Sequence, residues 1–238
     1  MNTIFCLPYA GGAASAYGDL KKIARTRNIE LAPVEYAGRA SRMAQPFYTD
    51  LYEAARDCYE QLKIYFSKHY VPEYGIFGHS MGSWVLYELV RLIQEKQELP
   101  QPKILFFSGN TVPQIKATER MSDLSDDAFW EQIYLLGGLE KELYEIGEFK
   151  EYILPILKND YRILEDYAGP EVEKLKTDIK ICIISGQKDN ITEEECRQWA
   201  EFTDQPLEIQ WFTGDHFYFR QEGRALIDYF CKKMQDEV

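Results

Sequence analysis

The sequence predicts an α/β protein in which helices cover both faces of a mostly parallel sheet. Strand-like and helix-like segments alternate along most of the chain, an order that favours parallel strands joined by helices. Several strand-like segments are apolar throughout, as expected of strands buried on both faces. The helix-like segment after Ser80 is apolar around most of its circumference until Arg91, which indicates deep burial.

The strand pattern occurs at Thr3–Leu7, Leu31–Glu35, Gly75–Phe77, Lys103–Ser108, Ile179–Ser185 and Leu207–Phe212. A helix is predicted over Asp50–Lys68, because apolar residues recur there at helical spacing. Further helices are predicted directly after Ser80, over Glu193–Phe202 and over Gln221–Met234.

One region interrupts this alternation. It has no convincing strand, but helical patterns occur at Ser125–Leu136, Lys141–Ile146 and Phe149–Tyr167. Helices inserted between two strands, beside a site at the carboxyl ends of the strands, are typical of a lid, although simple packing elements give the same pattern. We expect a core made of residues 1–112 and 171–238 and a helical lid insertion at residues 113–170.

The composition limits the possible partners and locations. A formal net charge of −12 argues against nucleic acid and against an anionic membrane surface, since both need a basic face. No segment approaches the ~18 consecutive apolar residues of a membrane span, and the amino terminus enters a strand pattern without the basic region of an export signal. The 5 scattered cysteines favour free thiols in a reducing cytoplasm. A monomer is the default expectation.

The segment most informative about chemistry is Gly78-His79-Ser80-Met81-Gly82, which lies between a strand pattern and a helix pattern. The glycines leave room for a sharp strand-to-helix reversal, which holds the serine hydroxyl exposed near the positive end of the helix. A serine in this position is suited to attack a carbonyl carbon. Ser80 is therefore the candidate nucleophile.

An activated serine needs a general base, and histidine is the usual one because its pKa lies near neutrality. His69 ends a charged helix and is expected to be solvated. His79 adjoins Ser80, where neighbouring side chains point apart, so it is expected only to shape the turn. His216 follows the last predicted strand, at the same edge of the sheet as Ser80, and is the candidate base.

The base in turn needs an acid that fixes its tautomer. Asp189 follows the predicted strand Ile179–Ser185 and is the candidate. Asp215 is the alternative, but a residue adjacent to His216 rarely curls back onto its ring. The order Ser80, Asp189, His216 is the chain order of α/β-hydrolase triads.

The oxyanion of an acyl-transfer intermediate needs hydrogen-bond donors. One is expected to be the backbone N–H of Met81, at the start of the helix. The second is expected from the loop after the first strand, where Ala10 or Tyr9 precedes Gly11 and Gly12. The sequence has no phosphate-loop or dinucleotide glycine pattern and no metal-ligand spacing, so neither a cofactor nor a metal is expected.

The chain resembles the type II (external, editing) thioesterases of nonribosomal peptide and polyketide synthesis. The resemblance covers essentially the whole chain and rests, besides the pentad, on Leu7-Pro8-Tyr9-Ala10-Gly11-Gly12, Gly38-Arg39, Leu136-Gly137-Gly138, Leu154-Pro155, Asp160-Tyr161, Gly186 with Asp189, and Gly214-Asp215-His216-Phe217.

The resemblance implies an α/β-hydrolase fold and hydrolysis of acyl thioesters on the phosphopantetheine arm of carrier proteins, without a cofactor of the enzyme's own. The task it implies is the removal of misprimed or stalled acyl groups. Ser80 is then the nucleophile, His216 the base and Asp189 its orienting acid. The oxyanion hole is formed by Met81 and Ala10.

Some residues depart from the family pattern or are harder to assign. Ala37 replaces a usual proline, Ser83 replaces a frequent glycine, and the segment Leu139–Lys141 lacks a common proline. An apolar acyl slot is a possible role for several aromatic residues, although ordinary core packing is the more economical interpretation of any single one. These are Tyr9, Phe129, Trp130 and Tyr134.

Carrier proteins are usually acidic, so a chain of this charge needs a local basic patch near the channel mouth. The candidates are Arg39, Arg42, Lys116, Arg120, Lys158 and Arg162. Two other functions use the same features. A carboxylesterase or lipase acting on small esters would have the same triad, and a catalytically silent binding protein could retain the same fold.

Overall fold

The computed structural model describes residues 1–113, 120–169 and 179–235. Its centre is one parallel sheet with the strand order β2-β1-β3-β4-β5-β6. Every predicted strand is present, with bounds close to those expected. The strands are β1 (Asn2–Leu7), β2 (Ile29–Pro33), β3 (Tyr74–His79), β4 (Ile104–Ser108), β5 (Lys180–Gly186) and β6 (Glu208–Phe212).

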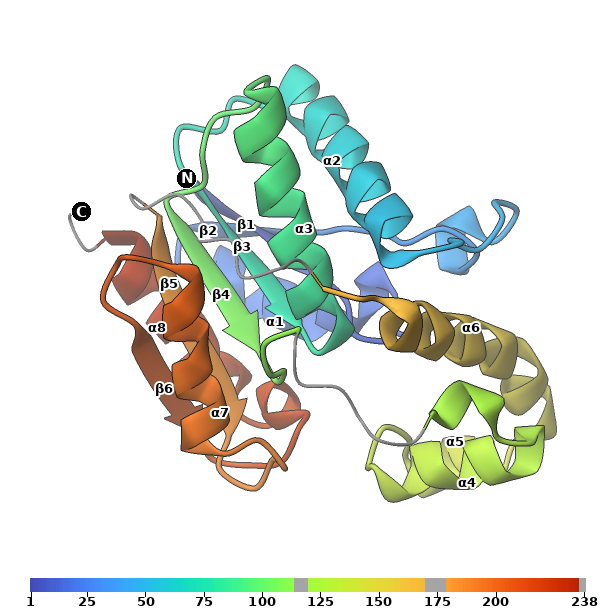
Figure 1. Cartoon of the computed structure of the whole chain (residues 1–238). Helices are drawn as coiled ribbons and strands as arrows, with labels where there is room; N and C mark the ends of the chain where they lie inside the picture. Colours follow the sequence, from blue (N-terminus) through green and yellow to red (C-terminus); the bar gives the residue numbers. More distant parts are fainter. Residues whose placement is uncertain (114–119, 170–178, 236–238) are drawn as a thin grey trace.

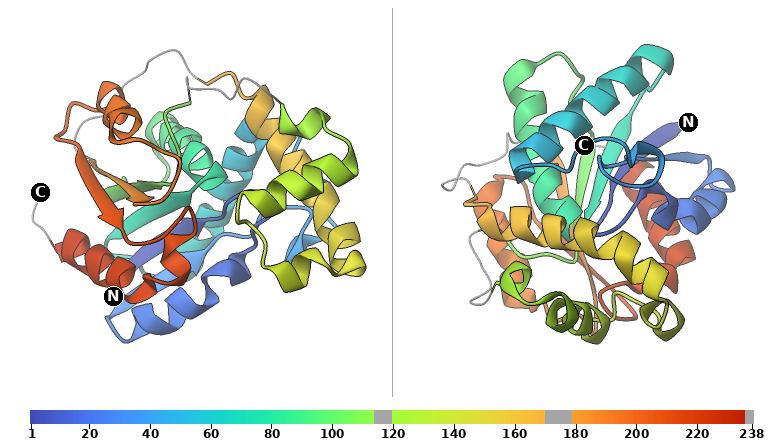
Figure 2. Two further views of the ribbon diagram at one scale, coloured as in Figure 1. Left: turned by 90° about the horizontal axis from the view of Figure 1, so that it is seen from below. Right: turned by 90° about the vertical axis from the view of Figure 1, so that its right-hand side faces the viewer.

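Helices cover both faces of the sheet, as Figures 1 and 2 show. Helices α1 (Gly18–Arg25) and α8 (Gly223–Gln235) contact one another on one face, and α2 (Leu51–Lys68) and α3 (Met81–Lys96) pair on the other. Successive side chains of a strand point to opposite faces. Ile4 therefore belongs to the core beneath α1 and α8, while its neighbour Phe5 belongs to the core beneath α2 and α3.

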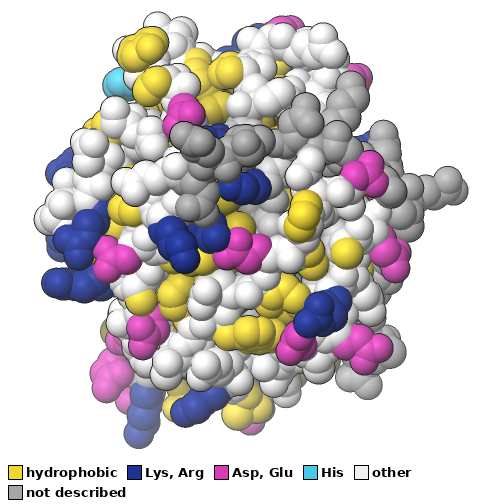
Figure 3. Space-filling view, turned by 90° about the vertical axis from the view of Figure 1, so that its left-hand side faces the viewer, with side chains coloured by type: hydrophobic (Ala, Val, Ile, Leu, Met, Phe, Trp, Pro, Cys, Tyr) yellow, Lys and Arg dark blue, Asp and Glu magenta, His cyan; other side chains and the backbone are white. Residues whose placement is uncertain are grey.

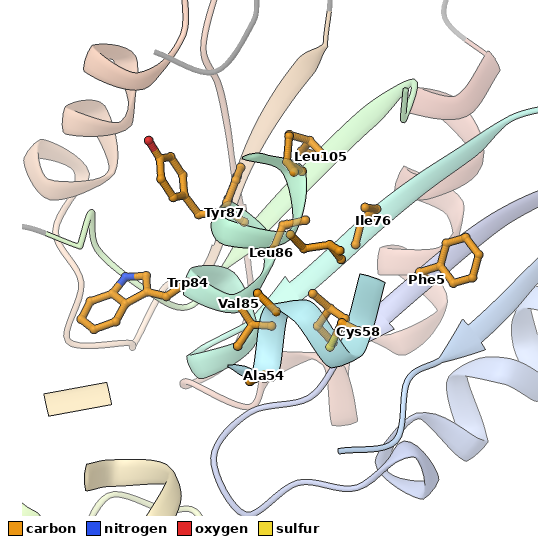
Figure 4. Close-up of a cluster of buried hydrophobic side chains, with 14 of the residues drawn as sticks. Phe5, Ala54, Cys58, Ile76, Trp84, Val85, Leu86, Tyr87 and Leu105 are labelled. Atoms are coloured by element: carbon orange, nitrogen blue, oxygen red, sulfur yellow. The ribbon is translucent and has the colours of Figure 1, made fainter. Parts of the chain in front are cut away.

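The core on the second face is drawn in Figure 4. Strand residues Phe5, Ile76 and Leu105 lie on one side of it, and helices α2 and α3 supply the other side through residues such as Ala54 and Val85. These side chains are buried at 2% exposure or less. At roughly 1.5–3 kcal/mol for each large apolar side chain, this layer contributes much of the stabilisation that fixes α3 on the sheet.

Two helices differ from the sequence expectation. Helix α1 was not predicted, because it is short, begins at Gly18, and fully buries only Leu20 and Ala24. The segment predicted as one helix over Glu193–Phe202 divides into α7 (Glu193–Arg197) and a 3₁₀ helix. Helix α2 ends as expected at an exposed His69, whose ring stacks on Tyr65 with centroids 4.3 Å apart.

Three further helices follow one another between β4 and β5, at one end of the sheet (Figures 1 and 2). They are α4 (Asp126–Leu135), α5 (Lys141–Tyr144) and α6 (Gly147–Asp166), which match the three predicted inserted helices. A separate apolar cluster joins them, in which Phe129 and Trp130 of α4 pack with Ile156 and Leu157 of α6. The predicted insertion also includes residues 114–119 and 170, which lie outside the described residues.

The surface mixes charges of both signs. On the face drawn in Figure 3, Lys and Arg side chains lie beside Asp and Glu side chains. Within the described residues, no helix is long and apolar enough to cross a membrane. The cysteines are free thiols; four of them are buried and Cys231 is half-buried.

Candidate active site

Ser80 occupies a strained turn between β3 and α3. Its backbone has φ 53° and ψ −117°, a conformation that non-glycine residues rarely adopt. The two flanking glycines are required by close backbone contacts. A Cβ at Gly78 would lie 2.2 Å from the carbonyl oxygen of Gly82, and a Cβ at Gly82 would lie 2.2 Å from that of Leu7. The expected strand-to-helix reversal is therefore present.

Residues at the end of β4 hold this turn in place. The N–H of Ser80 donates to the carbonyl oxygen of Ser108 at 2.7 Å, and the Asn110 side chain donates to the carbonyl oxygen of Ser80 at 2.9 Å. Ser83 lies beneath the turn, with its hydroxyl 2.8 Å from the Gly78 carbonyl oxygen and accepting from the Ser108 N–H at 3.0 Å. Ser83, which replaces a frequent glycine of the family pattern, thus links β3 to β4.

Asp189 and His216 meet at the carboxyl edge of the sheet. The Asp189 Oδ2 atom lies 2.9 Å from His216 Nδ1. Two backbone hydrogen bonds join their loops, from Gln187 N–H to Phe212 and from Lys188 N–H to Gly214, each 2.9 Å long. The alternative acid, Asp215, instead accepts the Phe217 N–H at 2.9 Å within its own turn.

The ionisation of Asp189 suits a partner for histidine. Burial raises its pKa, but hydrogen bonds from His216, the Asn190 N–H and the Ser185 hydroxyl, together with the charge of His216, outweigh that effect. The pKa of Asp189 therefore lies below its ordinary value, and the carboxylate stays negative at neutral pH. A negative carboxylate at Nδ1 leaves Nε2 of the neutral ring as a proton acceptor.

His79 lies behind His216 and is fully buried. Its Nδ1 atom is 2.9 Å from the Ser108 hydroxyl, which in turn lies 2.7 Å from the Tyr218 hydroxyl. Gly109 packs against both imidazoles, since a Cβ there would lie 2.7 Å from His79 Cε1 and 3.1 Å from His216 Cε1. The expectation that His79 shapes the turn is consistent with this position.

Ser80, Asp189 and His216 all line one cavity of about 600 Å³. Its polar wall comes from the loops at the sheet edge, including Tyr9, Ala10 and Asn110. Its other wall comes from the inserted helices and is almost entirely apolar. That wall consists of Ile133, Leu136, Gly138, Leu139, Leu143, Phe149, Ile153, Leu157 and Tyr161.

The aromatic residues suggested from the sequence only partly match this cavity. Tyr9 lines it, but Phe129 and Trp130 are 0% and 3% exposed within the apolar cluster of the inserted helices. Tyr134 stacks on Tyr144 with ring centroids 4.3 Å apart. Core packing was the correct interpretation for Phe129 and Trp130, because both lie on the side of α4 that packs on α6.

The predicted basic patch is not borne out for Arg39, which is only 1% exposed and forms a two-pronged ion pair with Asp160, both contacts being 2.7 Å. Arg42 is paired with Asp57. The other described candidates are also in ion pairs and line a different groove, on the far side of α6 from the cavity; they are Arg120, Lys158 and Arg162. Lys116 lies outside the described residues. Among described residues, Arg220 is the cation that lines the cavity.

The two expected oxyanion donors lie at the start of α3 and in the loop after β1. Met81 is the first residue of α3, so its N–H has no acceptor within the helix. Ala10 lies in a turn that the Gly12 N–H closes by donating to the Tyr9 carbonyl oxygen at 2.8 Å. Gly11 has φ 75° there, as the third residue of a type II turn requires.

Several contributors to the site were not found from the sequence. Gly109 and Asn110 directly follow β4, so the rule that pointed to Asp189 and His216, proximity to a strand's carboxyl end, also applies to them. Ala37, which replaces the usual proline, donates its N–H to the Tyr48 hydroxyl at 3.0 Å, a hydrogen bond that proline cannot make.

A parallel sheet, a serine on a sharp strand-to-helix turn and an Asp–His pair at the carboxyl edge define a serine hydrolase of the α/β-hydrolase fold. The family model described as "Thioesterase domain" matches residues 2–235. The chain belongs to this thioesterase family.

Individual relatives match the chain over almost its whole length. "Linear gramicidin dehydrogenase LgrE" of Brevibacillus parabrevis is 31% identical over 229 residues, covering 94% of this chain and 84% of the relative. The crystal structure of ClbQ from the colibactin NRPS/PKS pathway is 34% identical, with a TM-score of 0.87 over 99% of this chain and 98% of the other.

A further solved structure carries the subclass in its description. BorB, the type II thioesterase from the borrelidin biosynthetic cluster, is 26% identical, with a TM-score of 0.81 over 98% of this chain and 93% of the other. The resemblance to type II thioesterases and the α/β-hydrolase fold expected from the sequence are thus confirmed.

Proposed function

We propose that this thioesterase hydrolyses acyl thioesters carried on the phosphopantetheine arm of carrier proteins, with Ser80 as nucleophile, His216 as base and Asp189 as its orienting acid. The observation that carries the proposal is the 2.9 Å contact between Asp189 and His216 in the cavity that Ser80 also lines. The biosynthetic pathways of relatives such as ClbQ and BorB support the removal of misprimed or stalled acyl groups as its task.

The reaction follows from these roles. His216 accepts the Ser80 hydroxyl proton as the oxygen attacks the thioester carbon, and the resulting oxyanion receives the N–H groups of Met81 and Ala10. The imidazolium returns the proton to the departing pantetheine sulfur. A water molecule, deprotonated by His216, then attacks the acyl-serine, and the imidazolium returns that proton to the Ser80 oxygen as the acid is released. Each half-reaction passes through an oxyanion in the same hole.

The cavity favours an apolar acyl group. The wall formed by the inserted helices supplies aliphatic and aromatic side chains, while the polar groups lie at the sheet-edge loops. An acyl chain against the first wall buries apolar surface at about 25 cal/mol per Å². The pantetheine amides would then lie along the polar side. We propose accordingly that residues 113–170 form a lid over the acyl chain, above a core of residues 1–112 and 171–238.

The partner is an acyl or peptidyl carrier protein. Since Arg39, Arg42 and the groove cations are held in ion pairs, apolar contacts around the cavity mouth would contribute most to docking. Leu136 and Leu143 line the cavity and are 47% and 37% exposed, so they are available for such contacts. Free thiols at every cysteine support a cytoplasmic location, and we propose a monomer that needs no cofactor.

Mass spectrometry of acylated carrier proteins tests the proposal. Wild-type enzyme should remove the acyl group and leave free phosphopantetheine, while Ser80→Ala should leave the adduct intact. Equal loss of the adduct with both proteins would exclude Ser80 as nucleophile. Turnover of p-nitrophenyl esters without turnover of carrier-bound thioesters would favour a carboxylesterase, and failure of a fluorophosphonate to label Ser80 would favour a silent binding protein.

A further inference from the structure

A buried ion pair joins an inserted helix to the loop that carries Ala10. Asp160 of α6 is 0% exposed, and Arg39, in the segment after β2, is 1% exposed. Both Asp160 oxygens accept from the Arg39 guanidinium at 2.7 Å. Two charges withdrawn from water in this way are costly unless every remaining hydrogen-bonding position is also satisfied.

The remaining hydrogen bonds of this pair lead directly to the loop after β1. Asp160 Oδ2 also accepts the backbone N–H of Gly11 at 2.7 Å. The Arg39 guanidinium also donates to the carbonyl oxygen of Gly12 at 3.1 Å. The ion pair therefore holds the loop through the N–H of Gly11 and the carbonyl oxygen of Gly12, the two residues that follow Ala10.

The fit between α6 and the loop is also steric. A Cβ at Gly11 would lie 2.4 Å from Leu157 Cδ2, one turn before Asp160 on the same helix. Other contacts of the loop come from the core, namely Tyr36 to the Pro8 carbonyl oxygen at 3.1 Å and the Ala14 N–H to Glu35 at 3.1 Å. Asp160, by contrast, belongs to an inserted helix and hydrogen-bonds the peptide next to Ala10.

We infer that Asp160 is a positioning residue for the oxyanion hole, and that the Asp160–Arg39 pair makes hydrolysis depend on the docking of α6 against the core. This inference rests on the proposed function, because it concerns the N–H of Ala10 in the same hole. The Gly11 N–H belongs to the peptide that follows Ala10, and together with the turn bond from the Gly12 N–H to the Tyr9 carbonyl oxygen it restrains the direction of the Ala10 amide. An error of about 1 Å in such a group costs about 100-fold in rate.

Asp160→Asn is the most direct test, because asparagine keeps the shape but is neutral and has one acceptor oxygen. It cannot accept both hydrogen bonds from the Arg39 guanidinium and the one from the Gly11 N–H. Arg39→Lys is the second variant, since lysine keeps the charge but loses the two-pronged geometry. The matched control is Asp57→Asn. It breaks the pair of Asp57 with Arg42, which has the same two-pronged form but does not hydrogen-bond the Pro8–Ala14 loop.

Each variant is titrated with a fluorophosphonate to count competent serines, and turnover of a hexanoyl thioester is expressed per titrated site. For Asp160→Asn and Arg39→Lys, kcat per site should fall by about 10- to 100-fold, with KM changed less than about threefold. The Ki of a trifluoromethyl ketone, whose adduct places an oxyanion in the hole, should rise by the same factor as kcat falls. Asp57→Asn should retain wild-type turnover per site.

A purely structural role predicts fewer titrated sites with unchanged turnover per site, and that result would overturn the inference. So would a fall in kcat without a weaker trifluoromethyl ketone. If Asp160→Asn does not fold, the same measurements on Arg39→Lys test the inference. Failure of the proposed function has a different signature, namely a wild-type enzyme inactive on thioesters; an active ester substrate would then serve to measure the same ratios.

Discussion

The imidazole rings of His79 and His216 lie 4.8 Å apart, at an interplanar angle of 44°. Gly109 lies beside both rings, since a Cβ there would lie 2.7 Å from His79 Cε1 and 3.1 Å from His216 Cε1. His79 is fully buried, and the side chain of His216 is 27% exposed in the cavity. The position of the candidate base therefore depends on a neutral ring behind it and on a glycine beside it.

Replacing Gly109 by alanine should displace the His216 ring. The new Cβ would clash with His79 at 2.7 Å and press on the His216 ring at 3.1 Å, and the backbone has φ 60°, which alanine adopts at a cost of about 1–2 kcal/mol. Turnover per titrated site should fall by about 10- to 100-fold. Gly137→Ala is the control, since Gly137 has φ 75° but nothing within 4 Å of its Cβ position. Equal turnover of the two variants would contradict the prediction.

The charge state of His79 should appear in the pH dependence of stability. Burial, with the charges of His216 and Arg220, holds the pKa of His79 well below its ordinary value of 6.5. Between the two pKa values, His79 is protonated in the unfolded chain but neutral in the folded protein. The free energy of unfolding therefore falls as the pH drops below 6.5 towards the folded pKa.

His79→Gln removes this proton uptake. Between pH 6.5 and 5, its free energy of unfolding should fall less steeply than that of the wild type, by up to about 1.4 kcal/mol per pH unit. Urea unfolding at a series of pH values measures the two slopes. Parallel curves would mean that folding does not lower the pKa of His79.

Asp189→Asn should impair catalysis without changing the fold. The amide keeps the shape of the carboxylate but removes its charge and permits the wrong tautomer of His216. We expect kcat to fall by about 10³- to 10⁴-fold while KM changes little. Steady-state kinetics with a carrier-bound thioester measures both constants. A loss below tenfold would show that Asp189 is dispensable for orienting the base.

The acyl cavity should be adjustable from α6. Ile153 lines the apolar wall, so Ile153→Trp would shorten the space for the chain. The ratio of decanoyl to acetyl turnover should fall at least tenfold, since each methylene excluded from an apolar pocket costs about 1 kcal/mol or more. Glu151→Trp is the control because Glu151 is exposed on the same helix. Unchanged chain-length preference in Ile153→Trp would show that the acyl group lies elsewhere.

Much of the site was predictable because parallel strands bring their carboxyl ends to one edge. Ser80 directly follows β3, and Asp189 and His216 lie in the loops just after β5 and β6, strands whose apolar patterns are evident in the sequence. Their convergence on one cavity therefore needed only the strand assignments and the chemistry of a serine nucleophile. Glycine at positions 78 and 82 likewise indicated the sharp turn before its geometry was known.

The remaining features depend on contacts between distant segments. Arg39 was expected at the surface, as charged residues usually are, but Asp160, 121 positions later, makes its burial possible. Helix α1 escaped detection because only a few of its residues are buried. Neither the partner of a charge nor the packing of a short helix follows from local periodicity.

The Arg39–Asp160 pair has a consequence for engineering the specificity of this enzyme. Chimeras whose new insertion lacks an acid at the position of Asp160 would leave the Arg39 guanidinium unpaired in the protein interior. Grafts limited to α4 and α5 would leave the Arg39–Asp160 ion pair intact. Redesign for new acyl groups should therefore keep Asp160 of α6 and change only residues that line the cavity, such as Ile153 and those between α4 and α5.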